Sequence, residues 1–419
     1  MISRPIPLFA IILGATILQI SNGVLGIIIP LQMGLAQTSA TGIGLVITAY
    51  SIGFLIGCLK SPAIIGNIGH IRAFAALAAI SAVSSLLFIT VDWPPAWAIL
   101  RFAGGFSAAG LYAVIESWVT DHAPATGRGR LLAIYMICNK AGLMLGQGLL
   151  VFGDTSGIGF YLLAGICAVI SIVPVSLTRT GGPPTREVAT LSFFELYRIA
   201  PMGVVGCIGA GMVNPTMLGL APVYGLEIGV SAQQIPLLVV AAQLGTFILQ
   251  WPLGWFSDRI DRRVVIVLAT MGSSAAALIL AFAGNIGLPF LLILFVLWGG
   301  FALSVYSVCI VHAGDHVDHN QFVPLVSSLM LAWALGASVG PSLATLAINT
   351  FGAVGLMYYI SAVSAAIGGF ALWRMKHRGP VAVEDREVFV NIPASSPGVA
   401  DLIADIDRHQ TKADHAGDS

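Results

Sequence analysis

Twelve apolar stretches, each about twenty residues long, dominate this sequence and determine how the chain can fold. A helix of about 20 apolar residues is long enough to cross the roughly 30 Å hydrocarbon layer of a bilayer. Only 9% of the 419 residues are charged and 57% are hydrophobic, whereas ordinary soluble domains carry roughly 25% charged residues. The pattern excludes a soluble globular protein and predicts an all-α integral membrane protein.

The twelve stretches fall into two sets of six. The predicted membrane-spanning helices lie near residues 7–34, 42–60, 73–91, 96–118, 131–152 and 158–177, and near residues 199–225, 235–256, 264–284, 288–311, 323–348 and 353–373. A polar stretch with proline and glycine separates the sets. The expected organisation is a first bundle over 1–178, a linker over 179–198, a second bundle over 199–374 and a polar tail over 375–419.

The basic residues predict how the helices are oriented. Of the 19 lysines and arginines, 17 fall in the N-terminus, the even-numbered loops or the C-terminus, and the other two, Arg101 and Lys140, fall inside predicted helices. Basic loops stay in the cytoplasm. We therefore expect both termini to be cytoplasmic and the protein to lie in a bacterial inner membrane.

The two sets of helices also share a weak internal repeat. Matches at an offset of 192 residues or close to it predict two pseudo-symmetric six-helix halves. The matches pair Asn22, Pro30, Ser39 and Gly53 with Asn214, Pro222, Ser231 and Gly245, Gly104-Gly105-Phe106 with Gly299-Gly300-Phe301, and Gly142 and Gly146 with Gly336 and Gly340.

Several loop motifs resemble those of the major facilitator superfamily. The run Gly254-Trp-Phe-Ser-Asp258-Arg259-Ile-Asp261-Arg262-Arg263 is similar to the signature G-x-x-x-D-R-x-G-R-R, with Asp261 in the place of the second glycine. Arg101-Phe-Ala-Gly104-Gly105 resembles the helix-4 signature R-x-x-Q-G, with Gly104 in the place of the glutamine. The segments at 115–118, 129–132 and 312–321 most resemble the bacterial YcaD-like subgroup. The resemblance implies the twelve-helix major facilitator fold and transport by alternating access.

Glu116 is the only acidic residue placed within a predicted helix, and it is the first candidate for proton coupling. Desolvation would favour its protonated form near neutral pH. The alternative is a gate residue paired with Arg128, Arg130 or the basic loop after helix 8. Arg101 is the second candidate, because the matching arginine of the superfamily is linked with proton transfer in exchangers. Its alternative is a side chain that reaches the outer headgroups.

A second group of residues is expected to line a substrate cavity. Lys140 would lie near the bilayer midplane, where it could bind an anion with help from Asn139, or could instead form a structural pair with Glu116. Buried amides in the membrane either bind substrate or join helices. The remaining candidates are Gln19, Asn22, Asn214, Gln243, Tyr306 and Trp333.

The charged loops predict a cytoplasmic gate and exclude other chemistry. The gate candidates are Asp258, Arg259, Arg262, Arg263, His70, Arg72, Arg128 and Arg130. The run His312, Asp315, His316, Asp318 and His319 could hold a divalent ion but offers no closed ligand set, so we expect no metal. Phosphate-loop and hydrolase motifs do not occur, so we expect neither an enzyme nor a cofactor.

These observations predict a secondary active transporter for a small organic solute, working by alternating access. The expected coupling is to protons and the expected cargo is an anion. The alternative is a membrane sensor or assembly factor that kept the fold without transport. We expect a monomer in the lipid bilayer with a small-molecule substrate and no nucleic acid, since the net charge is zero and no basic patch occurs.

The predicted topology can be tested with reporter tags. Tags at both termini and at Lys60 should report the cytoplasm, whereas tags near Asp154 or Glu227 should report the outside, because the basic loops alternate with loops that lack basic residues. A reporter assay that places Asp154 and Arg179 on the same side of the membrane would contradict the twelve-helix arrangement.

Overall fold

The computed structural model describes residues 6–91, 93–122, 128–177, 191–282 and 286–377, and within these ranges its regular structure is entirely helical. The helices are α1 (Ile6–Leu35), α2 (Ala40–Ile68), α3 (His70–Leu87), α4 (Pro94–His122), α5 (Arg128–Leu149), α6 (Gly159–Ser176), α7 (Phe193–Ile199), α8 (Pro201–Glu227), α9 (Ile235–Arg259), α10 (Arg262–Ala281), α11 (Leu288–Ala302), α12 (Val305–Gly314), α13 (His319–Phe351) and α14 (Val354–His377).

Eleven helical spans in the described residues are long and apolar enough to cross a membrane, with α11 and α12 counted together as one span. The more polar α5, which carries Arg128, Arg130 and Lys140, is not among them, but it packs along α1 and completes the first half. The all-α fold of two six-helix halves is therefore confirmed.

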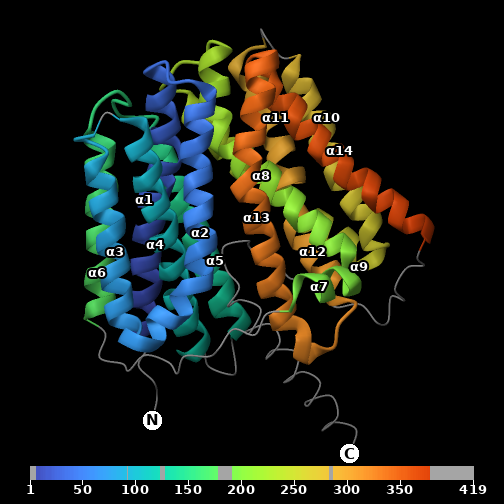
Figure 1. The fold of residues 1–419 in the computed structure, drawn as a ribbon, viewed down its shortest axis with the longest axis horizontal. Helices are drawn as coiled ribbons and strands as arrows, with labels where there is room; N and C mark the ends of the chain where they lie inside the picture. Colours follow the sequence, from blue (N-terminus) through green and yellow to red (C-terminus); the bar gives the residue numbers. More distant parts are fainter. Residues whose placement is uncertain (1–5, 92, 123–127, 178–190, 283–285, 378–419) are drawn as a thin grey trace, which may run out of the picture.

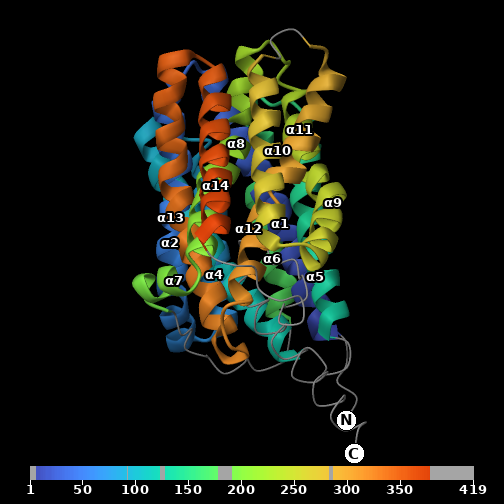
Figure 2. The same ribbon diagram turned by 90° about the vertical axis from the view of Figure 1, so that its right-hand side faces the viewer.

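The two halves stand side by side, with α1 to α6 in the first and α8 to α14 in the second (Figure 1). The contacts between the halves include α2 with α13, α1 with α8, α5 with α9 and α2 with α8. Figures 1 and 2 both show α7 toward the end of the bundle marked by the N-terminus. We call this end, where α9 ends at Arg259 and α10 begins at Arg262, the basic end, and the other the opposite end.

Several helices continue beyond the predicted apolar spans. The predicted span 42–60 belongs to a helix that reaches Ile68, and 323–348 belongs to one that runs from His319 to Phe351. Hydropathy marks only the part of a helix in hydrocarbon, whereas caps mark where the helix stops. Ser39 accepts a hydrogen bond from the Gly42 N–H at the start of α2.

The predicted span at 288–311 is present, but a short turn divides it into two helices. α11 ends at Ala302 and α12 begins at Val305. The Ser304 hydroxyl donates a hydrogen bond of 2.7 Å to the Gly300 carbonyl, one turn back. A hydroxyl that bonds to the preceding turn often bends a helix, and Ser304 lies in the turn between α11 and α12.

The end of the predicted linker at 179–198 is also helical, because α7 begins at Phe193. Its first turn is capped by Ser192, whose hydroxyl accepts a hydrogen bond from the Glu195 N–H at 3.3 Å. Residues 178–190, and the tail from 378 to 419, lie outside the described residues.

Glycines bring paired helices into backbone contact in the same way in both halves. A Cβ added to Gly53 or Gly105 would lie about 2 Å from a carbonyl oxygen of the partner helix, and the same holds for Gly245 and Gly299. Gly105 meets the Tyr50 carbonyl and Gly299 meets that of Ala242. Gly105 is therefore the counterpart of Gly299, which shifts the predicted glycine match by one residue.

The neighbouring glycines of α4 provide a matched test of this packing. We expect Gly105→Ala to destabilise the bundle, because its Cβ would lie 2.0 Å from the Tyr50 carbonyl oxygen, and overpacking typically costs about 1–3 kcal/mol. Gly104→Ala is the control, since a Cβ there meets nothing within 4 Å. Thermal unfolding of both purified variants measures the difference. Equal melting temperatures would contradict the close α2–α4 contact.

Candidate functional site

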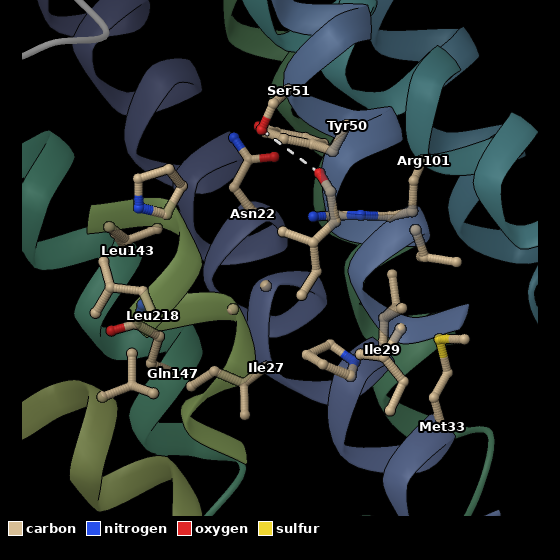
Figure 3. Close-up of a pocket in the computed structure, with 18 of the residues that line it drawn as sticks. Asn22, Ile27, Ile29, Met33, Tyr50, Ser51, Arg101, Leu143, Gln147 and Leu218 are labelled. Atoms are coloured by element: carbon tan, nitrogen blue, oxygen red, sulfur yellow. Dashed lines mark hydrogen bonds between the residues drawn. The ribbon is translucent and has the colours of Figure 1, made fainter. Parts of the chain in front are cut away.

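A cavity of about 190 Å³ lies between the two halves (Figure 3). Its walls come from α1, α2, α4 and α5 of the first half and from α8 and α9 of the second. Most of the lining is apolar, with a few polar side chains, as is typical of small-molecule sites. The polar lining residues are Asn22, Tyr50, Ser51, Arg101, Gln147 and Gln243.

Arg101 supplies the positive charge of this cavity. Figure 3 shows it extending from α4 among the lining residues, alongside Tyr50, and its guanidinium carbon lies 4.2 Å from the centroid of the Tyr50 ring. No hydrogen bond or salt bridge connects the guanidinium to another described residue, and the described lining contains no carboxylate. Arg101 therefore points into the cavity instead of reaching the headgroups.

Lys140 lies at the edge of the same cavity and links the two halves. Its Nζ atom, on α5, donates a hydrogen bond to Oε1 of the cavity-lining Gln243, on α9. Gln243 is therefore the partner that the structure shows for Lys140, and the alternative of a Lys140–Glu116 pair stays a prediction.

The predicted amide residues occupy two different places. Asn22 lines the cavity and donates a hydrogen bond of 2.8 Å to Gln19, which also accepts one from the Tyr112 hydroxyl at 2.8 Å. Gln19 is buried behind Asn22 and does not line the cavity. Asn139 is also buried outside the lining, and it donates a hydrogen bond to the Tyr135 hydroxyl within α5. Asn214 is also buried, and its Oδ1 atom accepts no hydrogen bond from the described residues.

Four aromatic rings form a layer across both halves on the basic-end side of the cavity. Phe54 lies about one helical turn beyond Tyr50 and Ser51 on α2, and its ring is 6.3 Å from both Tyr112 of α4 and Trp333 of α13. Trp333 in turn lies 6.3 Å from Tyr306 of α12. The predicted cavity residues Tyr306 and Trp333 therefore belong to this aromatic layer and do not line the cavity.

Neutral side chains join the halves toward the opposite end. The hydroxyls of Thr48 and Ser342 are 2.8 Å apart, and Asn349 donates a hydrogen bond of 2.9 Å to Thr41. Between these two pairs, a Cβ on Gly44 would lie 2.4 Å from the side chain of Thr345. The α2–α13 boundary is thus closed at this end by hydroxyl and amide groups.

Glu116 lies outside the cavity, closer to the basic end. It is buried in α4, one turn beyond Tyr112, at the level of the apolar cluster that includes Ile115 and Trp118. It is near enough to Tyr306 of the second half for an electrostatic interaction between them. Glu116 and Arg101, the two candidates for proton coupling, are therefore on the same helix but in different surroundings.

The predicted gate residues of the second half form a compact ionic cluster. The buried Arg262 lies 2.9 Å from Asp315 and 3.8 Å from Asp258. Asp261 caps α10 and pairs with Arg263 at 2.6 Å. Burial alone would raise the pKa of Asp261, but the hydrogen bonds and the charge of Arg263 outweigh it and hold the pKa below its ordinary value. The cap explains why an aspartate can replace the family's glycine here.

The remaining gate candidates do not join that cluster through the contacts that the structure describes. Arg259 is exposed and stacks on Trp255, with 3.8 Å from its guanidinium carbon to the ring centroid. His70 is buried and stacks on Trp118 of α4. Arg72 and Arg130 are exposed, and the side chain of Arg128 lies outside the described residues.

Sequence reasoning missed three polar residues of the cavity: Tyr50, Ser51 and Gln147. For Tyr50 and Gln147, the sequence offered one clue, which is the nearby glycines that fix how each helix is rotated. Gly105 packs on the Tyr50 carbonyl, and Arg101 lies four residues earlier on the same face of α4. Gln147 directly follows Gly146, which packs against the Ile20 carbonyl of α1.

The family model of the Major Facilitator Superfamily matches this chain over residues 11–231 and 199–400. Among curated relatives, the uncharacterized MFS-type transporter YcaD of Salmonella enteritidis PT4 is 30% identical over 372 residues, covering 85% of this chain and 93% of the relative. YcaD of Salmonella typhi matches equally well.

Solved transporter structures share the fold. The nucleoside transporter NupG aligns with a TM-score of 0.72 at 13% identity, covering 90% of this chain and 100% of that one. A D-xylose–proton symporter aligns with a TM-score of 0.69 at 17% identity, over 87% and 97% of the two chains. These relatives are transporters and not enzymes. The family match and the YcaD relatives together show that this chain is a multi-pass membrane protein of the major facilitator superfamily.

Proposed function

We propose that this protein is a proton-coupled secondary transporter that moves a small organic anion by alternating access. One observation supports the anionic cargo above others: the inter-half cavity contains the Arg101 guanidinium, with Lys140 at its edge, and no described carboxylate lines it. An arginine has five N–H donors and no acceptor. A carboxylate or phosphate group would supply both the charge and the acceptors that the lining lacks.

The contacts on the two sides of the cavity support alternating access. Neutral hydrogen bonds close the boundary toward the opposite end, whereas aromatic rings cross it toward the basic end. A rocking motion of one half against the other can exchange one set of contacts for the other, as in transporters built from internal repeats. The cavity with its unsatisfied arginine favours transport over a sensor that binds no solute.

Glu116 is the proposed proton carrier. It is buried one turn from Tyr112, whose hydroxyl belongs to the hydrogen-bonded group with Gln19 and Asn22 at the cavity wall. A proton on Glu116 could therefore change the contacts of the cavity through a short path. Each proton that moves inward through 100 mV supplies about 2.3 kcal/mol, which corresponds to a solute gradient of roughly fifty-fold at one proton per solute.

The proposed orientation places the basic end in the cytoplasm of a bacterial inner membrane. This follows from the loop arginines gathered there and from the positive-inside rule. Both termini would then be cytoplasmic. A monomer is the proposed working unit, with the cavity lined by both halves of one chain.

Arg101→Gln should weaken binding of anionic solutes. Removing hydrogen bonds to a charged group costs about 1.5–3 kcal/mol, so we expect roughly ten- to hundred-fold weaker binding. The measurement is a thermal-shift screen of carboxylates, phosphates and neutral analogues on purified protein. Arg259→Gln is the matched control, because Arg259 is exposed and stacks on Trp255 away from the cavity. Anions that stabilise Arg101→Gln as strongly as wild type would contradict the assignment.

Glu116→Gln should abolish accumulation driven by a pH gradient and spare exchange of solute at equal pH, because the amide cannot carry a proton while the cavity is unchanged. Transport in liposomes across an imposed pH gradient measures this effect. Glu195→Gln on the exposed helix α7 is the control. If the gradient drives Glu116→Gln as strongly as wild type, Glu116 is not the coupling residue.

A further inference from the structure

The short helix α7 carries a cluster of exposed aromatic side chains that the transport site does not use. Phe194 is 87% exposed, Phe193 50% and Tyr197 46%, whereas Leu196 is 1% exposed and packs in the core of the bundle. Three aromatics on two turns give α7 an apolar face on the outside of the bundle, with the ring centroids of Phe193 and Phe194 6.4 Å apart.

The angular order of the α7 side chains gives the helix three distinct sides. At about 100° per residue, Phe193, Tyr197 and Phe194 fall within an arc of roughly 100°. Leu196 lies about 60° to one side of this arc, facing the bundle, and the exposed Arg198 and Glu195 lie on its other side. A helix in a membrane interface needs such an order: protein on one side, an apolar face in the lipid and a charged face in water.

A hydrogen bond just before α7 fixes the position of this helix along α13, and so its depth in the membrane. The Leu191 N–H donates a hydrogen bond of 2.9 Å to the Ser328 hydroxyl of α13. Ser328 lies nine residues into α13, which is about 14 Å along a helix of 33 residues that spans about 50 Å. A hydrocarbon layer of about 30 Å centred on that helix would begin about 10 Å from its end. The linker therefore meets α13 near the boundary between headgroups and hydrocarbon.

The position of α7 in the fold agrees with that depth. Figure 2 shows α7 projecting sideways from the bundle past α13. Farther along α13, the exposed residues Leu335, Val339, Leu343 and Leu346 repeat at helical spacing and form a lipid-facing stripe. The aromatic face of α7 thus continues an apolar surface that already faces the membrane.

We propose that α7 is an interfacial anchor whose partner is the headgroup–acyl boundary of the leaflet at the basic end. Phe193, Phe194 and Tyr197 insert into that boundary, while Glu195 and Arg198 remain in water. The Ser328 bond then holds α13, and with it the second half, to the plane of the membrane as the halves move. This assignment does not depend on the cargo or on proton coupling.

Spin labels on neighbouring residues of α7 test the anchor in proteoliposomes of the full chain. Phe194→Cys and Glu195→Cys are labelled separately in a background where the half-buried Cys58 and Cys138 are replaced by alanine. Relaxation by oxygen, which concentrates in lipid, is compared with relaxation by a water-soluble nickel chelate. We expect the label at 194 to respond to oxygen and be protected from nickel, and the label at 195 to show the reverse.

Two results would overturn the proposal. If both labels respond equally to nickel, the aromatic face of α7 lies in water. If the label at 194 is protected from both reagents, protein covers that face, either another part of this chain or a second copy. Labels at Phe193→Cys and Arg198→Cys repeat the comparison, so a local disturbance at residue 194 cannot decide the outcome alone.

Discussion

Backbone contact at paired glycines is the interaction on which the rest of this structure depends. Lipid tails are as apolar as leucine side chains, so helices in a membrane gain little from apolar burial alone and associate through close packing. Gly53 and Gly105 bring α2 against α4, and Gly142 and Gly146 bring α5 against α1. These contacts fix how each helix is rotated, and so decide that Arg101, Asn22 and Gln147 face the cavity.

The glycine contacts are repeated in the two halves, but the charged residues within the membrane are not. The glycine contacts relate α4 to α11 and α12, and α5 to α13, at an offset of 194 residues. At that offset Arg101, Glu116 and Lys140 correspond to Phe295, Ile310 and Ala334. The first half therefore holds the charges within the membrane, and the second half holds the ionic cluster around Arg262 at the basic end.

The sequence predicted the fold well because each helix carries its own signal. Apolar length gave the spans, and arginine placement gave a topology that remains a prediction. The site was harder to predict. The position of a residue along a helix can be counted from the sequence, but the direction in which its side chain points within the bundle cannot. The positions of Arg101 and Lys140 along their predicted helices did not reveal that Arg101 lies against Tyr50 or that Lys140 reaches Gln243 on the other half. Such pairs depend on how two distant segments pack, which no local pattern contains. The break after Ala302 has no distinct local signal either, because the hydroxyl bond that Ser304 makes one turn back also occurs at Ser85 and Thr270 inside unbroken helices.

The neutral contacts between α2 and α13 give the opposite end a particular physical character. Thr48, Ser342, Thr41 and Asn349 lose only hydrogen bonds between uncharged groups when the halves part there, and water replaces such bonds at a net cost of about 0.5–1.5 kcal/mol each. No charge has to be separated in either of these contacts. Dissolved ions screen interactions between charges and leave those between hydroxyls almost untouched. These two contacts therefore open with almost the same free energy at low and at high ionic strength.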